Sequence, residues 1–103
     1  MRKLVRDKIP DLIQGQTPRV VTGTYGKKRF RAALLDKLVE EAQEARATEG
    51  AEFLLAEELA DLREVMNAIA EEFDIPWNMV DLEQENKLVK KGGFTGRHWV
   101  DFD

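Results

Sequence analysis

The amino-acid sequence predicts an all-α fold, a small helical bundle built on an antiparallel helix hairpin. Residues 27–48 and 52–73 each carry apolar side chains at the three- and four-residue spacing of one helix face. The connection between these stretches is short and contains Gly50, which favours an antiparallel pair. Because the chain has 103 residues and no cysteine, we expect a single domain over residues 1–103 without a disulfide framework.

The N-terminal part of the chain is expected to contribute a short helix and a loop. Residues 1–14 should start extended and continue into a short helix, which Gly15 ends. The segment 17–26 contains one proline and two glycines, so it is predicted to be a loop. No motif in residues 19–29 points to a function, and the role of that loop stays open.

A third helix is predicted over residues 76–90, and the pair Gly92-Gly93 should stop it. Beyond the two glycines, aromatic and polar residues alternate, which is typical of an extended segment. We expect Phe94 and Trp99 in this segment to pack back on the bundle.

Two acidic pairs interrupt the apolar faces of the long helices. Glu41 and Glu44 lie in the first long helix, and Glu58 and Asp61 lie in the second. Residues three apart occupy neighbouring positions on one helix face. At about 1.5 Å rise per residue, both pairs lie roughly 9 to 17 Å from the turn, so four carboxylates should converge. Other acids fall on different arcs and are predicted to be solvated: Glu57, Glu64, Glu71 and Glu72.

A convergence of carboxylates is repulsive without a cation, so the pattern predicts a divalent metal site. The chain has no cysteine and one histidine, which leaves oxygen ligands and favours Mg²⁺, with Mn²⁺ as a substitute. A salt-bridged helical surface is the alternative, because E-x-x-E pairs are common in glutamate-rich helices.

The net charge and the hydropathy of the chain limit the kinds of partner that we expect. The net charge of -4 gives no overall attraction to nucleic acid, and no apolar run approaches the ~20 residues of a membrane span. We therefore expect a cytoplasmic protein with neither nucleic-acid nor membrane partners.

Lysine and arginine gather near the chain ends, where they either balance the acids or bind phosphates bridged by the metal. The residues predicted to bind substrate phosphates are Lys3, Arg6, Lys8, Lys87 and Lys91.

Several motifs together resemble the all-α NTP pyrophosphohydrolase superfamily, which includes MazG, the dimeric dUTPases and phosphoribosyl-ATP pyrophosphohydrolase. Residues 40–44 have the pattern Glu-Glu-x-x-Glu, and residues 57–61 have the pattern Glu-Glu-Leu-Ala-Asp. Residues 3–10, Lys-Leu-Val-Arg-Asp-Lys-Ile-Pro, and residues 91–94, Lys-Gly-Gly-Phe, resemble a small house-cleaning, phosphoribosyl-ATP pyrophosphohydrolase-like branch. Lys91 stands where relatives often carry arginine, so it would meet a phosphate as a point charge.

The resemblance implies a Mg²⁺-dependent enzyme that cleaves the α–β phosphate bond of a nucleoside triphosphate, giving a monophosphate and pyrophosphate. Glu40 or Glu41 would serve as the general base. The implied metal ligands are Glu41, Glu44, Glu58 and Asp61.

The oligomeric state and the substrate can be predicted only as broad classes. A helical domain of this size often gains burial by self-association, so we expect a homodimer or homotetramer. The substrate would be a nucleoside triphosphate, including non-standard ones. The alternatives are a phosphoribosyl-ATP pyrophosphohydrolase of histidine synthesis and a non-catalytic helical module that binds a partner through its acidic groove. No residue can be tied to a particular base.

Overall fold

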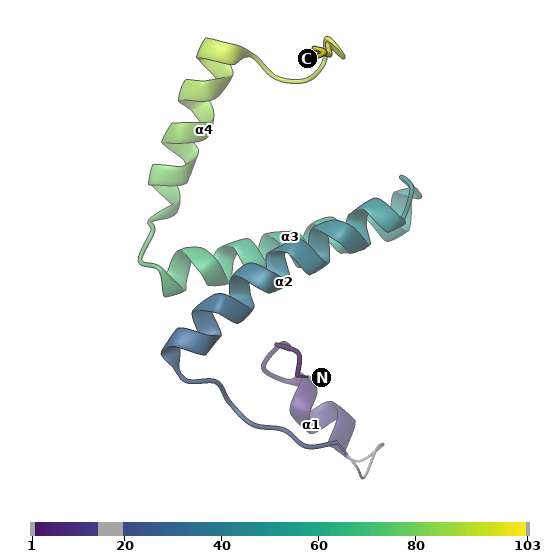
Figure 1. The fold of residues 1–103 in the computed structure, drawn as a ribbon, viewed down its shortest axis with the longest axis vertical. Coiled ribbons are helices and arrows are strands. Elements are labelled where there is room, and N and C mark those ends of the chain that lie inside the picture. The colour runs from purple at the N-terminus through teal and green to yellow at the C-terminus, as the bar shows by residue number, and fades with distance from the viewer. Residues whose placement is uncertain (1, 15–19, 103) are drawn as a thin grey trace.

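The computed structural model describes residues 2–14 and 20–102, and every regular element in these ranges is a helix (Figure 1). The elements in chain order are α1 (Ile9–Gln14), α2 (Lys27–Ala47), α3 (Glu52–Glu72) and α4 (Trp77–Lys91). The predicted all-α class is confirmed, and the three longer helices begin and end within one residue of their predicted bounds. None of the helices so described is both long and apolar enough to cross a bilayer.

The N-terminal predictions are tested only in part. The predicted helix stop at Gly15 and the first residues of the predicted loop lie outside the described residues. Residues 20–26 are irregular, as predicted, and lead directly into α2.

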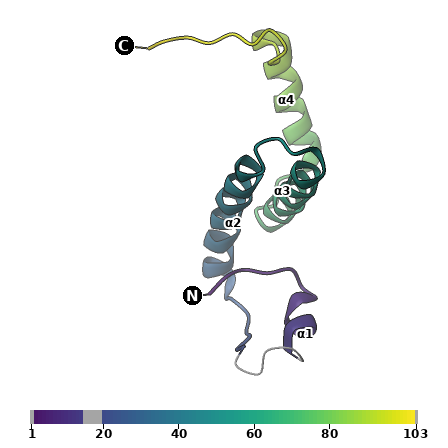
Figure 2. The same cartoon turned by 90° about the vertical axis from the view of Figure 1, so that its right-hand side faces the viewer.

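The centre of the fold is a hairpin of α2 and α3, which lie antiparallel and side by side (Figures 1 and 2). Leu34 and Ala70 are the buried apolar residues of the described chain. Glu41 is also buried, with 6% of its surface exposed. The interior of the hairpin is therefore apolar near its open end and charged at the level of Glu41.

The turn of the hairpin is formed by residues 48–50. The Thr48 hydroxyl donates a hydrogen bond to the Ala45 carbonyl at 2.7 Å and accepts one from the Gly50 amide at 3.3 Å. Glu49 and Gly50 have φ angles of 53° and 83°, in the left-handed region that glycine adopts without a side-chain penalty. These bonds and angles reverse the chain, so that α3 runs back along α2.

Arg31 ties the two helices together at the opposite, open end of the hairpin. Its Nε donates to Glu72 Oε2 at 3.1 Å, and its Nη2 donates to the Glu72 carbonyl at 3.3 Å. The guanidinium also lies 4.9 Å from the centre of the Phe73 ring, within the range of a cation–π interaction. One side chain of α2 therefore fixes the last turn of α3.

α4 leaves the hairpin after Asp74, whose φ is 54°, and points away from α2 and α3 (Figures 1 and 2). We call residues 77–102 the C-terminal arm. Phe94 and Trp99 in this arm are 97% and 83% exposed. The prediction that they pack back on the bundle is wrong, because the direction of α4 carries them away from the hairpin.

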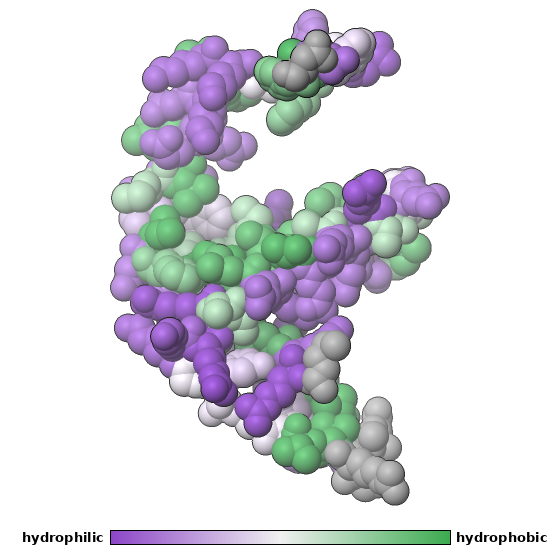
Figure 3. Space-filling model, in the orientation of Figure 1, coloured by the Kyte–Doolittle hydropathy of each residue, from purple (hydrophilic) through white to green (hydrophobic). Residues whose placement is uncertain are grey.

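One chain alone does not close a bundle around a core. It exposes 9671 Å², whereas a compact monomer of 11.8 kDa would expose about 5,900 Å². The radius of gyration is 17.6 Å, against about 13 Å for a compact domain of this length. Figure 3 shows apolar side chains on the visible surface of the hairpin. A large apolar area is thus left without a partner in the single chain.

Candidate metal centre

Three of the four predicted metal ligands come together across the hairpin. Glu41 and Glu44 of α2 and Glu58 of α3 each offer one carboxylate oxygen, and these atoms lie within 4.8 Å of one another. The three-residue spacing places the first two on one face of α2, and α3 brings the third from the opposite side. We call these three residues the acidic cluster.

Two carboxylate oxygens in the acidic cluster are buried without a hydrogen-bond partner. They are Glu41 Oε2 and Glu58 Oε2. The other oxygen of Glu41 lies 3.5 Å from the ammonium of Lys37, one turn earlier in α2. Burying a polar atom without a partner costs free energy, and such atoms are rare in folded proteins. These oxygens are therefore suited to hold a cation, because a cation would satisfy both.

The electrostatics of the cluster agree with that interpretation. Burial, the largest cause, acts together with the neighbouring carboxyl groups of Glu58 and Glu44 to raise the pKa of Glu41 to about 7, against the opposing charge of Lys37. Burial also raises the pKa of Glu58; the charges of Glu44 and Asp61 add to this rise, and its contact with Glu41 opposes it. Without a cation the cluster therefore tends to keep a proton near neutral pH.

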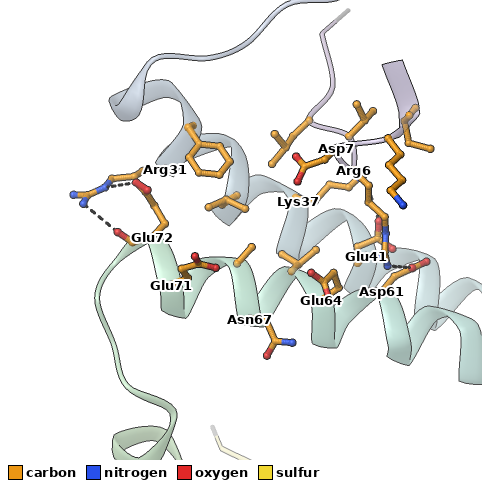
Figure 4. Close-up of a pocket in the computed structure, with 18 of the residues that line it drawn as sticks. Arg6, Asp7, Arg31, Lys37, Glu41, Asp61, Glu64, Asn67, Glu71 and Glu72 are labelled. Carbon is orange, nitrogen blue, oxygen red and sulfur yellow. Dashed lines mark hydrogen bonds and ion pairs between the residues drawn. The ribbon is translucent and has the colours of Figure 1, made fainter. Parts of the chain in front are cut away.

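Asp61, the fourth predicted ligand, does not join the acidic cluster. It accepts a hydrogen bond from Arg6 Nη2 at 2.7 Å, an ion pair drawn in Figure 4. Asp61 lies three residues after Glu58 on α3, so it occupies the neighbouring position of the same helix face. The predicted quartet thus appears as a cluster of three with its fourth member held by the N-terminal segment (residues 2–8).

Glu40, one of the two predicted catalytic residues, points to a different set of partners. Its Oε1 lies 3.3 Å from Lys3 Nζ and 3.5 Å from Lys37 Nζ. The hydrogen bond from Lys3 is the main cause that lowers the pKa of Glu40. Glu40 is therefore ionised at neutral pH but is a weaker base than Glu41 next to it, whose pKa is about 7.

An open cleft of about 1340 Å³ lies between the N-terminal segment and the hairpin, and its lining includes Glu41 and Asp61 (Figure 4). Phe30 and Val65 contribute apolar surface to this cleft, and Lys8 contributes a charge. With a cation at the acidic cluster, a polyanion with an apolar group attached could place its charged end on that cation and the remainder along the cleft.

The predicted phosphate ligands divide into two groups. Lys3 and Arg6 bind acids at or beside the cluster, and Lys8 lines the cleft. Lys87 and Lys91 are exposed residues of α4, which points away from the hairpin (Figure 1). The structure of one chain therefore brings the N-terminal basic residues to the site and leaves the C-terminal ones apart from it.

Sequence reasoning missed Lys37, which reaches both Glu40 and Glu41 at 3.5 Å. The signal was present, because Lys37 precedes these acids by three and four residues, the spacing at which side chains of a helix meet. It went unused because Lys37 lies outside the basic groups at the chain ends.

Comparison of the chain with protein-family models, with curated proteins and with solved structures finds no match. The family resemblance therefore rests on the sequence motifs alone.

Proposed function

We propose that the chain is a Mg²⁺-dependent nucleoside triphosphate pyrophosphohydrolase. It would cleave the α–β phosphate bond and give a nucleoside monophosphate and pyrophosphate. The observation that carries this proposal is the buried Glu41, which keeps one oxygen without a hydrogen-bond partner and brings a carboxylate oxygen within 4.8 Å of those of Glu44 and Glu58. The basic N-terminal segment beside the cluster and the resemblance of the motifs favour a triphosphate as the substrate.

The residues present fit Mg²⁺, because its usual protein ligands are carboxylate oxygens, and Mn²⁺ accepts the same donors. Glu41, Glu44 and Glu58 would hold the ion, with Asp61 as a fourth ligand. When bound, such an ion polarises phosphate oxygens and increases the acidity of water.

The protein's own groups would supply charge balance and a proton acceptor. In the hydrolysis, a water oxygen forms a bond to one phosphorus, the bond from the α–β bridging oxygen to that phosphorus breaks, and a proton must be taken up. Glu40, ionised between Lys3 and Lys37, and Glu41, with a pKa of about 7, are the candidate acceptors. Arg6 and Lys8 lie at the cleft, where their charges would stabilise the negative phosphates.

The main test is the loss of activity on removing one carboxylate. Glu41→Gln and Asp61→Asn should each abolish Mg²⁺-dependent pyrophosphate release, measured with a coupled phosphate assay, while the far-UV circular dichroism stays helical. Glu57→Gln removes the same charge at an exposed position of α3 and should keep wild-type turnover. Full turnover in both site variants would exclude the cluster from the reaction.

The substrate is to be found with a panel of ordinary and damaged nucleoside triphosphates and phosphoribosyl-ATP. Pyrophosphate release from phosphoribosyl-ATP alone would assign the chain to histidine synthesis. Release from none of them, together with wild-type binding of Mg²⁺, would favour a non-catalytic module.

The active form would be a homodimer or homotetramer. The 9671 Å² exposed by one chain exceeds the expectation for a compact monomer by about 3,800 Å², well above the roughly 800 Å² that one partner contributes to a standard interface. Lys87 and Lys91 lie apart from the cluster of their own chain. A role for them in substrate binding therefore requires the arm of a second copy to reach the cluster.

A further inference from the structure

Two ion pairs fasten the N-terminal segment to the hairpin beside the acidic cluster. Lys3 Nζ lies 3.3 Å from Glu40 Oε1, and Arg6 Nη2 lies 2.7 Å from Asp61 Oδ1. In Figure 4, Arg6 reaches from the N-terminal segment down to Asp61, next to Glu41. The segment therefore brings two positive charges beside the acidic cluster.

The pair of Arg6 and Asp61 is short but exposed to solvent. The two side chains are 57% and 40% exposed. Exposed ion pairs contribute little net stability, because water and salt compete for both charges. A phosphate offers the guanidinium a bidentate, doubly charged partner, which is a stronger contact than one exposed carboxylate. Replacing Asp61 by a phosphate as the partner of Arg6 therefore costs little free energy.

Asp61 lies on the same face of α3 as Glu58, so its release from Arg6 would leave its carboxylate beside the acidic cluster. It occupies the helix position one turn after Glu58, and its charge is among those that act on the Glu58 carboxyl. Glu58 and Glu41 each keep a buried oxygen without a hydrogen-bond partner. Among the described residues, the hydrogen bond from Arg6 holds Asp61 away from these oxygens.

We propose that Arg6 couples substrate binding to completion of the metal site: it holds Asp61 in the free protein and gives it up on binding the phosphates of the substrate. The inference rests on the proposed function and extends it, because it makes Asp61 a ligand that only the substrate recruits. Since coupling between two sites is reciprocal, an ion bound by Asp61 also frees Arg6 for phosphate. In this account Arg6 binds the substrate and also positions Asp61.

The test is a double-mutant cycle on metal affinity in the absence of nucleotide. Mn²⁺ binding is measured by titration calorimetry and by the paramagnetic resonance of free Mn²⁺ for the wild type, Arg6→Gln, Asp61→Asn and the double variant. Arg6→Gln should tighten Mn²⁺ binding by about two- to fivefold, the range for one exposed ion pair. The same change in the Asp61→Asn background should have no effect, because no held carboxylate is left to release.

The loss of one positive charge could by itself tighten Mn²⁺ binding, without any release of Asp61. Two comparisons distinguish this general charge effect from the release of Asp61. Arg31→Gln removes the same charge from an ion pair at the open end of the hairpin and should leave Mn²⁺ affinity unchanged. Equal tightening by Arg6→Gln with and without Asp61 would overturn the exchange. So would unchanged Mn²⁺ affinity in Arg6→Gln.

Two further readouts keep the outcome decisive. With a non-hydrolysable α,β-methylene triphosphate, the gain in Mn²⁺ affinity should be smaller in Arg6→Gln than in the wild type, and an equal gain would overturn the coupling. If Arg6→Gln loses its helical dichroism, Arg6→Lys replaces it and should tighten Mn²⁺ binding by a smaller factor; no change would count against the exchange.

Absence of any Mn²⁺ binding to the wild type would remove the proposed function as well, whereas Glu41-dependent binding without the Arg6 effect would remove the exchange alone.

Discussion

The buried carboxyl of Glu41 makes the stability of the metal-free protein depend on pH. Its pKa rises from an ordinary value of 4.5 in the unfolded chain to about 7 in the folded protein. The folded state therefore binds this proton more tightly than the unfolded state. The resulting stability is fully present below pH 4.5 and is lost as the pH rises through 7.

In a chelating buffer, the melting temperature of the wild type should therefore fall between about pH 4.5 and pH 7.5. In Glu41→Gln, whose side chain stays neutral, the melting temperature should decrease less over this pH range. In the wild type, saturating Mg²⁺ should abolish the decrease, because it binds the ionised form. Thermal melts followed by circular dichroism at several pH values measure both effects. A pH dependence in Glu41→Gln as steep as in Glu57→Gln would contradict the assignment.

The sequence predicted part of this residue-scale arrangement. Glu41 and Glu58 could be identified because they fall inside apolar arcs, and the structure buries the first and half-buries the second. The engagement of Asp61 could not be predicted, because its partner Arg6 lies 55 residues away and no periodic pattern links the two. The position of a fourth ligand thus depends on a tertiary contact.

At the scale of elements, the hairpin depends on contacts at its open end as well as on its turn. Arg31 combines an ion pair with Glu72, a second hydrogen bond to the backbone and a cation–π contact with Phe73. These partly buried contacts act on the last turn of α3, where the chain departs towards α4.

Arg31→Ala should lower the free energy of unfolding by about 1–2 kcal/mol, since it removes charge-assisted hydrogen bonds and a cation–π contact. Arg29→Ala, at an exposed position of the same helix, is the matched control and should change it by less than about 0.5 kcal/mol. Urea unfolding at fixed protein concentration measures the difference. Equal midpoints for the two variants would show that the open end contributes nothing.

The helices themselves were predictable, whereas the course of the C-terminal arm was not. Apolar spacing and Gly50 define α2 and α3 locally, so their bounds follow from the sequence. The aromatic alternation around Phe94 and Trp99 indicates that these side chains need burial, but it does not indicate against which surface. The prediction failed there, because the partner of an apolar side chain is not a local property.

For the whole molecule, the exposed area argues that folding and association are linked. Within the described residues the hairpin buries few apolar side chains, while large ones such as Leu59, Phe94 and Trp99 are more than half exposed. A second copy would bury this surface, and the melting temperature would then depend on protein concentration.

Sedimentation velocity should show a dimer or tetramer at micromolar concentration. The substitution of Phe94 and Trp99 by serine should weaken association at least about tenfold, which corresponds to roughly 1.4 kcal/mol. Asn86→Ser, at an exposed polar position of α4, should leave association unchanged. A monomer at all concentrations would contradict the proposed oligomer.

The divergence of the C-terminal arm from the hairpin also determines what fluorescence can report. The chain has two tryptophans, Trp77 and Trp99, and both belong to the arm, whereas α2 and α3 have none. Tryptophan emission therefore follows the surroundings of the arm, while far-UV dichroism is dominated by the two 21-residue helices of the hairpin. If the arm packs against a second copy, the midpoint of the tryptophan signal in denaturant should fall as the protein is diluted, and this dependence on protein concentration would mark dissociation of subunits rather than a folding intermediate.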